Sequence, residues 1–174
     1  MKVKITLYEF YAMGINSLLM KAPWERESQI SAYRESFLME QRLFSLAILF
    51  LLGEEYVPKE TLKTMPPKFH DQVRHSVNTA VFLRALKHHF RHHPQGDKLA
   101  NHMLQRMETY ISITREARAQ NADPLEAITF KLAKRVPPQT KEQLQKYHER
   151  VQKIFDYTDG LIQKSLEEKY EIVQ

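Results

Sequence analysis

The stretch LFSLAILFLL, residues 43–52, is the least polar part of the chain and decides the fold. Apolar residues occupy every face of a helix drawn through it, and a helix that is apolar all round is buried in a protein core or in a membrane. The stretch is too short to span a bilayer, which needs ~20 apolar residues. Arg42 and the Glu54-Glu55 pair flank it with charge. We therefore expect a central core helix.

The helix around this stretch is predicted to run from 24 to 53. In its first half, apolar residues recur at helical spacing on one face, at Ile30, Tyr33 and Phe37. Gly53 follows the apolar run, and glycine is the residue type that most readily takes the left-handed conformation past a helix end. Gly53 therefore marks the predicted end of the core helix.

Helical periodicity covers most of the remaining chain. Further helices are predicted at about 5–20, 59–64, 68–93, 97–120, 124–136 and 140–172. The last three have Asp97, Asp123 and Thr140 as predicted N-caps. Residues 3–7 alternate as a short strand would, but no second strand-like segment is evident to pair with them, so a helix is favoured. The sequence predicts an all-α fold with about six to seven helices, in a single domain over 1–174.

The helix at 140–172 carries the clearest amphipathic pattern. Its seam residues recur in steps of three and four, as in a coiled coil, at Leu144, Tyr147, Val151, Ile154, Thr158, Leu161 and Ser165. Such a seam packs inside the monomer, or it forms a dimer interface or a docking surface for a protein partner. Burial inside the monomer is the favoured interpretation.

The composition is that of a globular protein. The hydrophobic fraction is 43% and the charged fraction 27%, which are ordinary values. The chain has no cysteine, which excludes a disulfide framework, zinc fingers and thiol catalysis. No secretion signal is evident, because Tyr8, Glu9 and Tyr11 interrupt the apolar run near the N-terminus. We therefore expect a cytoplasmic protein with no membrane span.

The positive charge is concentrated in one segment. Residues 66–122 hold nine Lys and Arg against four acids, which accounts for the whole net charge of +5. Cations that neutralise phosphates release counterions and bind nucleic acid in a salt-dependent way. The predicted nucleic-acid site, for DNA or RNA, is a stripe on one helix with its continuation on the next: Arg84, Lys87, His88, Arg91, Lys98, Arg106 and Arg115.

The aromatic residues of this segment are not expected to contact bases. Phe90 and Tyr110 fall on apolar faces that belong in the core, so the pattern favours backbone or shape recognition over stacking on single-stranded bases. The histidines at 88–93 would add charge as pH falls through ~6.5. The alternative is a solvated face that only keeps the protein soluble.

The same histidines suggest a second chemistry. His88 and His92 are four residues apart, as are His89 and His93, and two histidines one turn apart on a helix can bind a transition metal when a third ligand such as His102 joins them. The simpler interpretation is that these rings are solvated and complement the dipole at the helix C-terminus. We therefore predict no resident metal or cofactor.

Familiar catalytic patterns do not occur in the sequence. No glutamate precedes a histidine by three residues, which excludes the di-iron bundle pattern, and no Gly-rich phosphate loop is present. The pair His70-Asp71 and the segment 75–80 resemble parts of HD-type phosphohydrolases, but that family has an isolated histidine before the pair and none precedes His70. Glu35 and Glu40 would form a catalytic carboxylate pair only if both were buried.

The sequence therefore favours a non-enzymatic interaction protein that binds nucleic acid through the surface of residues 68–118. In its small size, helical content, basic charge and lack of cysteine it resembles the small helical subunits of nucleoprotein assemblies, which implies a role as one subunit of a larger assembly. Three alternatives remain. They are a protein-binding adaptor or oligomeric scaffold that uses the C-terminal seam, a metal-dependent helical enzyme, and a protein bound at a membrane surface.

Overall fold

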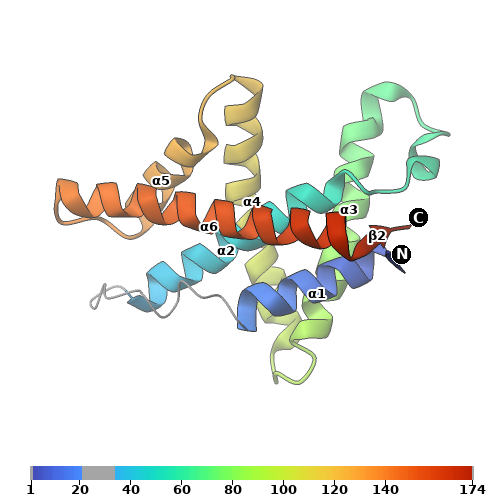
Figure 1. Ribbon diagram of the computed structural model, residues 1–174, viewed down its shortest axis with the longest axis horizontal. Coiled ribbons are helices and arrows are strands. Elements are labelled where there is room, and N and C mark those ends of the chain that lie inside the picture. The colour runs from blue at the N-terminus through green and yellow to red at the C-terminus, as the bar shows by residue number, and fades with distance from the viewer. Residues whose placement is uncertain (1, 21–33, 174) are drawn as a thin grey trace.

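The computed structural model describes residues 2–20 and 34–173, which form six α-helices with very little strand and confirm the all-α class. The elements in chain order are β1 (Val3–Ile5), α1 (Leu7–Met20), α2 (Arg34–Glu54), the 3-10 helices η2 (Lys59–Leu62) and η3 (Pro67–Phe69), α3 (His70–His89), α4 (Gly96–Ala119), α5 (Pro124–Arg135), α6 (Lys141–Glu168) and β2 (Tyr170–Ile172). Helix α2 runs through the middle, and α1, α4 and α6 pack around it (Figure 1).

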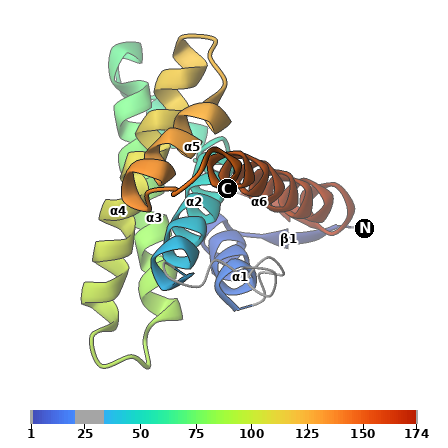
Figure 2. The ribbon, with the colours of Figure 1, turned by 90° about the vertical axis from the view of Figure 1, so that its left-hand side faces the viewer.

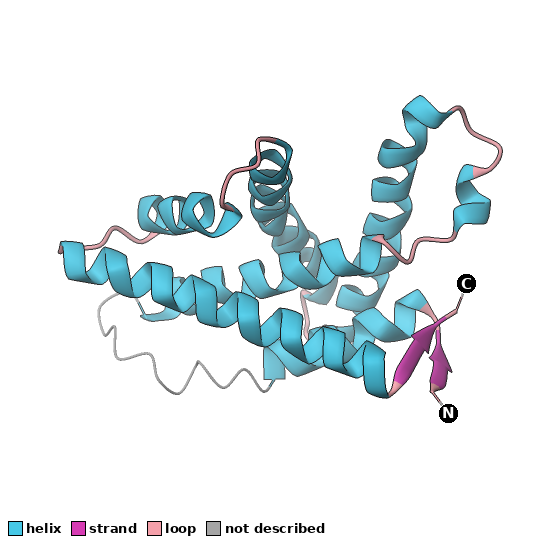
Figure 3. Cartoon of the chain, turned by 45° about the horizontal axis from the view of Figure 1, so that its top comes forward, coloured by secondary structure: helices cyan, strands magenta, loops and turns pink. Residues whose placement is uncertain are grey.

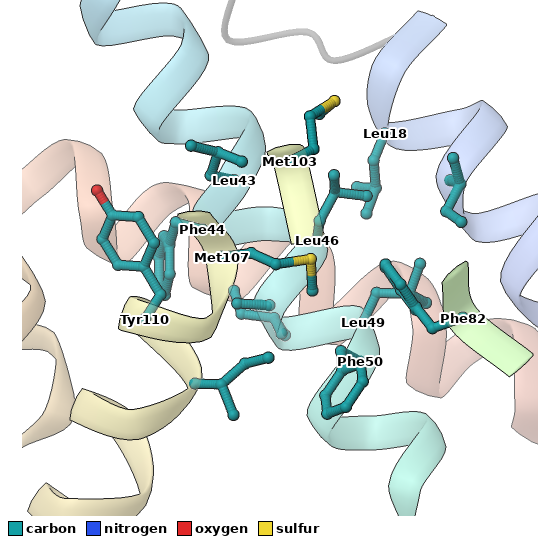
Figure 4. Close-up of a cluster of buried hydrophobic side chains, with 14 of the residues drawn as sticks. Leu18, Leu43, Phe44, Leu46, Leu49, Phe50, Phe82, Met103, Met107 and Tyr110 are labelled. Carbon is teal, nitrogen blue, oxygen red and sulfur yellow. The ribbon is translucent and has the colours of Figure 1, made fainter. Parts of the chain in front are cut away.

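The apolar stretch of α2 forms the centre of the core, as predicted. Every residue from Leu43 to Phe50 is buried. Their side chains lie between Leu18 of α1, Phe82 of α3 and Met107 of α4 (Figure 4). Since each buried Leu or Phe contributes about 1.5–3 kcal/mol, this one segment holds three other helices in place. The predicted start of the helix near residue 24 lies outside the described residues.

Gly53 does not end the core helix, and the prediction of a left-handed residue there is wrong. Helix α2 continues to Glu54, and no glycine among the described residues has a positive φ. A Cβ atom at position 53 would instead overlap the hydroxyl group of Tyr11 from α1. Glycine is present because two helices pack closely at this point, which is a tertiary cause and not a local one.

A buried polar network joins three helices beside Gly53. The Tyr11 hydroxyl of α1 donates to Oδ1 of Asn78 in α3, and the Asn78 side-chain amide donates to the carbonyl oxygen of Phe50 in α2 at 3.1 Å. Neither Tyr11 nor Asn78 is exposed. Because an unpaired buried polar group costs about 1–3 kcal/mol, this network favours one relative placement of α1, α2 and α3.

Two buried tyrosines predict a loss of stability at alkaline pH. Burial raises the pKa of Tyr11, and burial together with the nearby Glu40 carboxylate raises that of Tyr110. The unfolded chain releases these protons near pH ~10, whereas the folded chain retains them. The stability that these two tyrosines contribute is therefore fully present below pH ~10, and it is lost as pH rises above that value. We expect the free energy of unfolding, measured in urea, to decrease with pH between about pH 9 and 11. Tyr110→Phe should make this decrease smaller, and an unchanged pH dependence would contradict the role given to Tyr110.

Helix α6 buries the middle of its predicted seam within the monomer, as the favoured interpretation expects, but Leu161 is 38% exposed. The buried side chains are Tyr147, Val151, Ile154, Thr158 and Ile162, and α6 packs them against α2 and α5. The buried part of the seam is therefore not available to a partner, and an adaptor or dimer role for α6 stays a prediction. The helix ends at Glu168 and not at residue 172.

The two ends of the chain pair as a small parallel sheet, which the sequence did not predict. Val3 lies opposite Tyr170, and Ile5 lies opposite Ile172. The pairing includes 2.8 Å bonds from the Val3 N–H to the Lys169 carbonyl oxygen and from the Val173 N–H to that of Ile5. Figure 3 shows the two strands side by side at one end of α6. The alternation at residues 3–5 was therefore a true strand signal.

Two of the three predicted N-caps are confirmed. The Asp123 side chain accepts a bond from the Leu125 N–H, and the Thr140 side chain accepts one from the Gln143 N–H. Helix α4 differs, because it begins at Gly96 with Gln95 as its N-cap, so Asp97 is not the cap. The predicted helix at 68–93 is also too long, since α3 covers only His70–His89.

Candidate functional site

Helices α3 and α4 form an antiparallel hairpin whose turn, residues 90–95, projects from the rest of the molecule, at the bottom of Figures 1 and 2. The turn is tight. The His93 N–H donates to the Phe90 carbonyl oxygen and the Gly96 N–H to that of His93, both at 2.9 Å. A Cβ at Gly96 would overlap the Phe90 carbonyl oxygen. This turn, the last turn of α3 and the first turn of α4 make a defined end that projects from the rest of the molecule.

Five of the seven predicted site residues lie at this hairpin end: Arg84, Lys87, His88, Arg91 and Lys98. All are exposed except Lys87, which is half-buried and lies 3.5 Å from Asp97. A hollow of about 380 Å³ has Arg91 and Lys98 in its lining. Because α3 ends at His89, Arg91 belongs to the turn and does not continue the helical stripe that the sequence predicted. We call these five residues the basic hairpin end.

Arg106 and Arg115 are not part of the basic hairpin end. Arg106 pairs with Glu40 of α2, which is only 4% exposed, and Arg115 donates to both carboxylate oxygens of Glu54 at 2.6 and 2.5 Å. Both arginines therefore neutralise carboxylates of α2. The sequence carried a signal for this, because Arg106 lies three residues after Met103 and Arg115 four after Ile111, so both border the apolar face of α4.

The structure does not place the histidines in the pairs that a metal site would need. His92 and His93 follow the end of α3 and therefore share no helical face with His88 and His89. The His93 Nδ1 accepts a bond from the Gln95 N–H at 3.2 Å. Burial lowers the pKa of His89, helped by Arg91 and His88. Among residues 2–20 and 34–173, no three His, Asp or Glu side chains are grouped closely enough to hold a metal ion.

A second ionic cluster, which sequence reasoning missed, ties α2, α3 and α4 together. The His75 ring lies between two carboxylates, with Nδ1 3.6 Å from Glu54 and Nε2 3.5 Å from Glu108. The Arg115 guanidinium also approaches the His75 Nδ1 at 3.1 Å. Of the two carboxylates that the sequence suggested as a pair, Glu40 forms an ion pair with Arg106. The side chain of Glu35 lies outside the described residues. These groups crosslink three helices.

One aromatic residue of α1 also reaches the basic hairpin end. The guanidinium carbon of Arg84 lies over the Tyr8 ring, 4.9 Å from its centroid. The His88 ring stands edge-on to Tyr8 at 6.3 Å. No local signal in the sequence connects Tyr8 with residues of α3.

A second hollow, of about 310 Å³, lies between α1 and α6. Its lining is mostly apolar, with Leu18, Leu161 and Leu166 among it, and Lys169 is the one charged residue in that lining. The described residues of its lining include no acidic side chain.

No helix of residues 2–20 and 34–173 combines the length and the apolar character needed to cross a bilayer. Comparison of the chain with models of protein families, with curated proteins and with solved structures finds no match.

Proposed function

We propose that this chain is a non-enzymatic, cytoplasmic nucleic-acid-binding protein that contacts the phosphate backbone with the basic hairpin end, as one subunit of a larger assembly. One observation carries the proposal. Residues 84–102 hold four Lys and Arg against a single acid, Asp97, and three of those cations, Arg84, Arg91 and Lys98, are exposed. A projecting end with this charge can approach a phosphate backbone, and each phosphate contact releases counterions.

Charge reversal at this end should weaken binding. We expect Arg91→Glu with Lys98→Glu to lower the affinity for a fluorescein-labelled RNA or DNA oligonucleotide at least tenfold at 100 mM salt. The slope of log affinity against log salt should become shallower by about 1.8 for duplex DNA and about 1.4 for a single strand, since each lost phosphate contact removes about 0.9 or about 0.7 respectively. Fluorescence anisotropy at several salt concentrations measures both quantities.

Helix α6 supplies the matched control. Lys153→Glu with Lys164→Glu changes the net charge equally at two exposed positions far along the chain from the hairpin. This control should retain the wild-type salt slope. If both double variants weaken binding to the same extent, net charge and not the hairpin end determines affinity, and the site assignment is wrong. If the wild-type chain binds neither RNA nor DNA, the proposed function is wrong.

A further inference from the structure

Two members of the basic hairpin end, Arg84 and His88, meet the ring of Tyr8 from another helix. Tyr8 of α1 is half-buried and packs against the core. Arg84 of α3 lies over its ring at 4.9 Å, and His88, one turn further along α3, meets the same ring edge-on at 6.3 Å. Arg84 and His88 are both exposed. We call these three residues the stacking cluster.

The stacking cluster holds a guanidinium in an ordered plane at the surface. A free arginine side chain loses rotamer entropy when a ligand fixes it. Arg84 is already positioned by cation–π attraction to a ring that the core holds in place. A planar guanidinium also offers a face on which a nucleic-acid base can stack, which an ammonium group does not. The cluster is therefore better suited to a flat π system than to a point charge.

Single-stranded and duplex nucleic acids differ in what they offer to such a surface. The bases of a single strand can splay out and stack on aromatic rings and guanidinium planes. The bases of a duplex are already stacked on one another, and only their edges are accessible in the grooves. A planar site next to exposed cations therefore selects for unpaired bases.

We infer that the stacking cluster binds a base of single-stranded nucleic acid on Arg84, while Arg91 and Lys98 contact the neighbouring phosphates. This rests on the proposed function and adds the substrate class. The segment 66–122 alone favours backbone or shape recognition over stacking, because its aromatic residues belong in the core. Tyr110 is buried, as predicted, but Tyr8 supplies an aromatic ring from a different helix.

The test compares 12-nucleotide single strands of DNA and RNA with a duplex of equal length, by fluorescence anisotropy. Arg84→Lys keeps the charge and removes the plane. We expect it to weaken single-strand binding about tenfold, because stacking contributes this much per base, and to change duplex binding less than twofold. Arg74→Lys, the same substitution on α3 but away from the hairpin end, should change neither.

A second readout detects stacking directly. A single strand with 2-aminopurine in place of one adenine should lose fluorescence when wild-type protein binds, and Arg84→Lys should abolish this quenching. Tyr8→Leu should act like Arg84→Lys; its circular dichroism melt shows whether it folds, and Arg84→Lys decides alone if it does not.

The outcomes separate this inference from the proposed function. Equal loss of single-strand and duplex affinity in Arg84→Lys, or a wild-type affinity for duplex that equals that for single strands, overturns the stacking inference while phosphate binding stands. Absence of any binding by the wild-type chain overturns both.

Discussion

Replacement of Glu40 by alanine is expected to lower the free energy of unfolding by about 3–5 kcal/mol, the cost of removing one member of a buried ion pair. Glu40 is only 4% exposed and accepts bonds from the Arg106 guanidinium and the Tyr110 hydroxyl. Without the carboxylate, both donors lose their partner inside the protein. Since about 1 kcal/mol shifts the Tm of a domain of this size by roughly 2–4 °C, a thermal melt should show a decrease of roughly 6–20 °C.

An exposed ion pair provides the comparison for this result. Glu60 and Lys63 are each 65% exposed, and a pair of this kind contributes about 0–1 kcal/mol. Glu60→Ala should therefore leave the Tm nearly unchanged. Arg106→Met introduced into Glu40→Ala should recover part of the loss, because it removes the uncompensated charge. Equal melts for Glu40→Ala and Glu60→Ala would show that burial does not strengthen the Glu40 pair.

Gly53→Ala is the second substitution with a large expected effect, a loss of about 2–6 kcal/mol. The new methyl group would occupy the space of the Tyr11 hydroxyl, so the ring must move and release its bond to Asn78. Overpacking costs about 1–3 kcal/mol, and the unpaired polar groups add about 1–3 kcal/mol. Chemical unfolding in urea measures the loss.

Gly160 tests the same substitution where the space is open. It lies within α6, and a Cβ there would have no neighbour within 4 Å. Alanine is more favourable than glycine inside a helix by roughly 0.5–1 kcal/mol, so Gly160→Ala should stabilise the protein. The two substitutions should therefore have opposite signs. A stabilising Gly53→Ala would refute the close approach of α1 and α2.

Much of the fold is encoded locally and was therefore predictable. The all-round apolar character of residues 43–52 indicated burial, and the capping signals at Asp123 and Thr140 placed two helix starts correctly. These signals depend only on residues within a few positions of one another. The C-terminal seam was predicted correctly in its middle, where α6 packs against the core, but Leu161 is exposed and Ile162 is buried instead.

Features that depend on distant partners were missed. The strand signal at residues 3–5 was discarded because its partner, residues 170–172, was masked by the end of a strong helical pattern. Two residues of the predicted nucleic-acid site were misassigned for the same reason. Arg106 and Arg115 were predicted to contact phosphates, because nothing near them in the sequence identifies their acidic partners. Those partners, Glu40 and Glu54, lie on another helix. Contacts between helices decide which charges remain available for a ligand.

The pairing of β1 with β2 has a consequence for biosynthesis. The ribosome makes Val3–Ile5 near the beginning of this chain, but their hydrogen-bonding partners at 170–172 emerge only after all six described helices. Until then the early strand has an open edge that other polypeptides can join. The hydrogen-bonded register of this nascent segment can therefore form only after translation has passed α6.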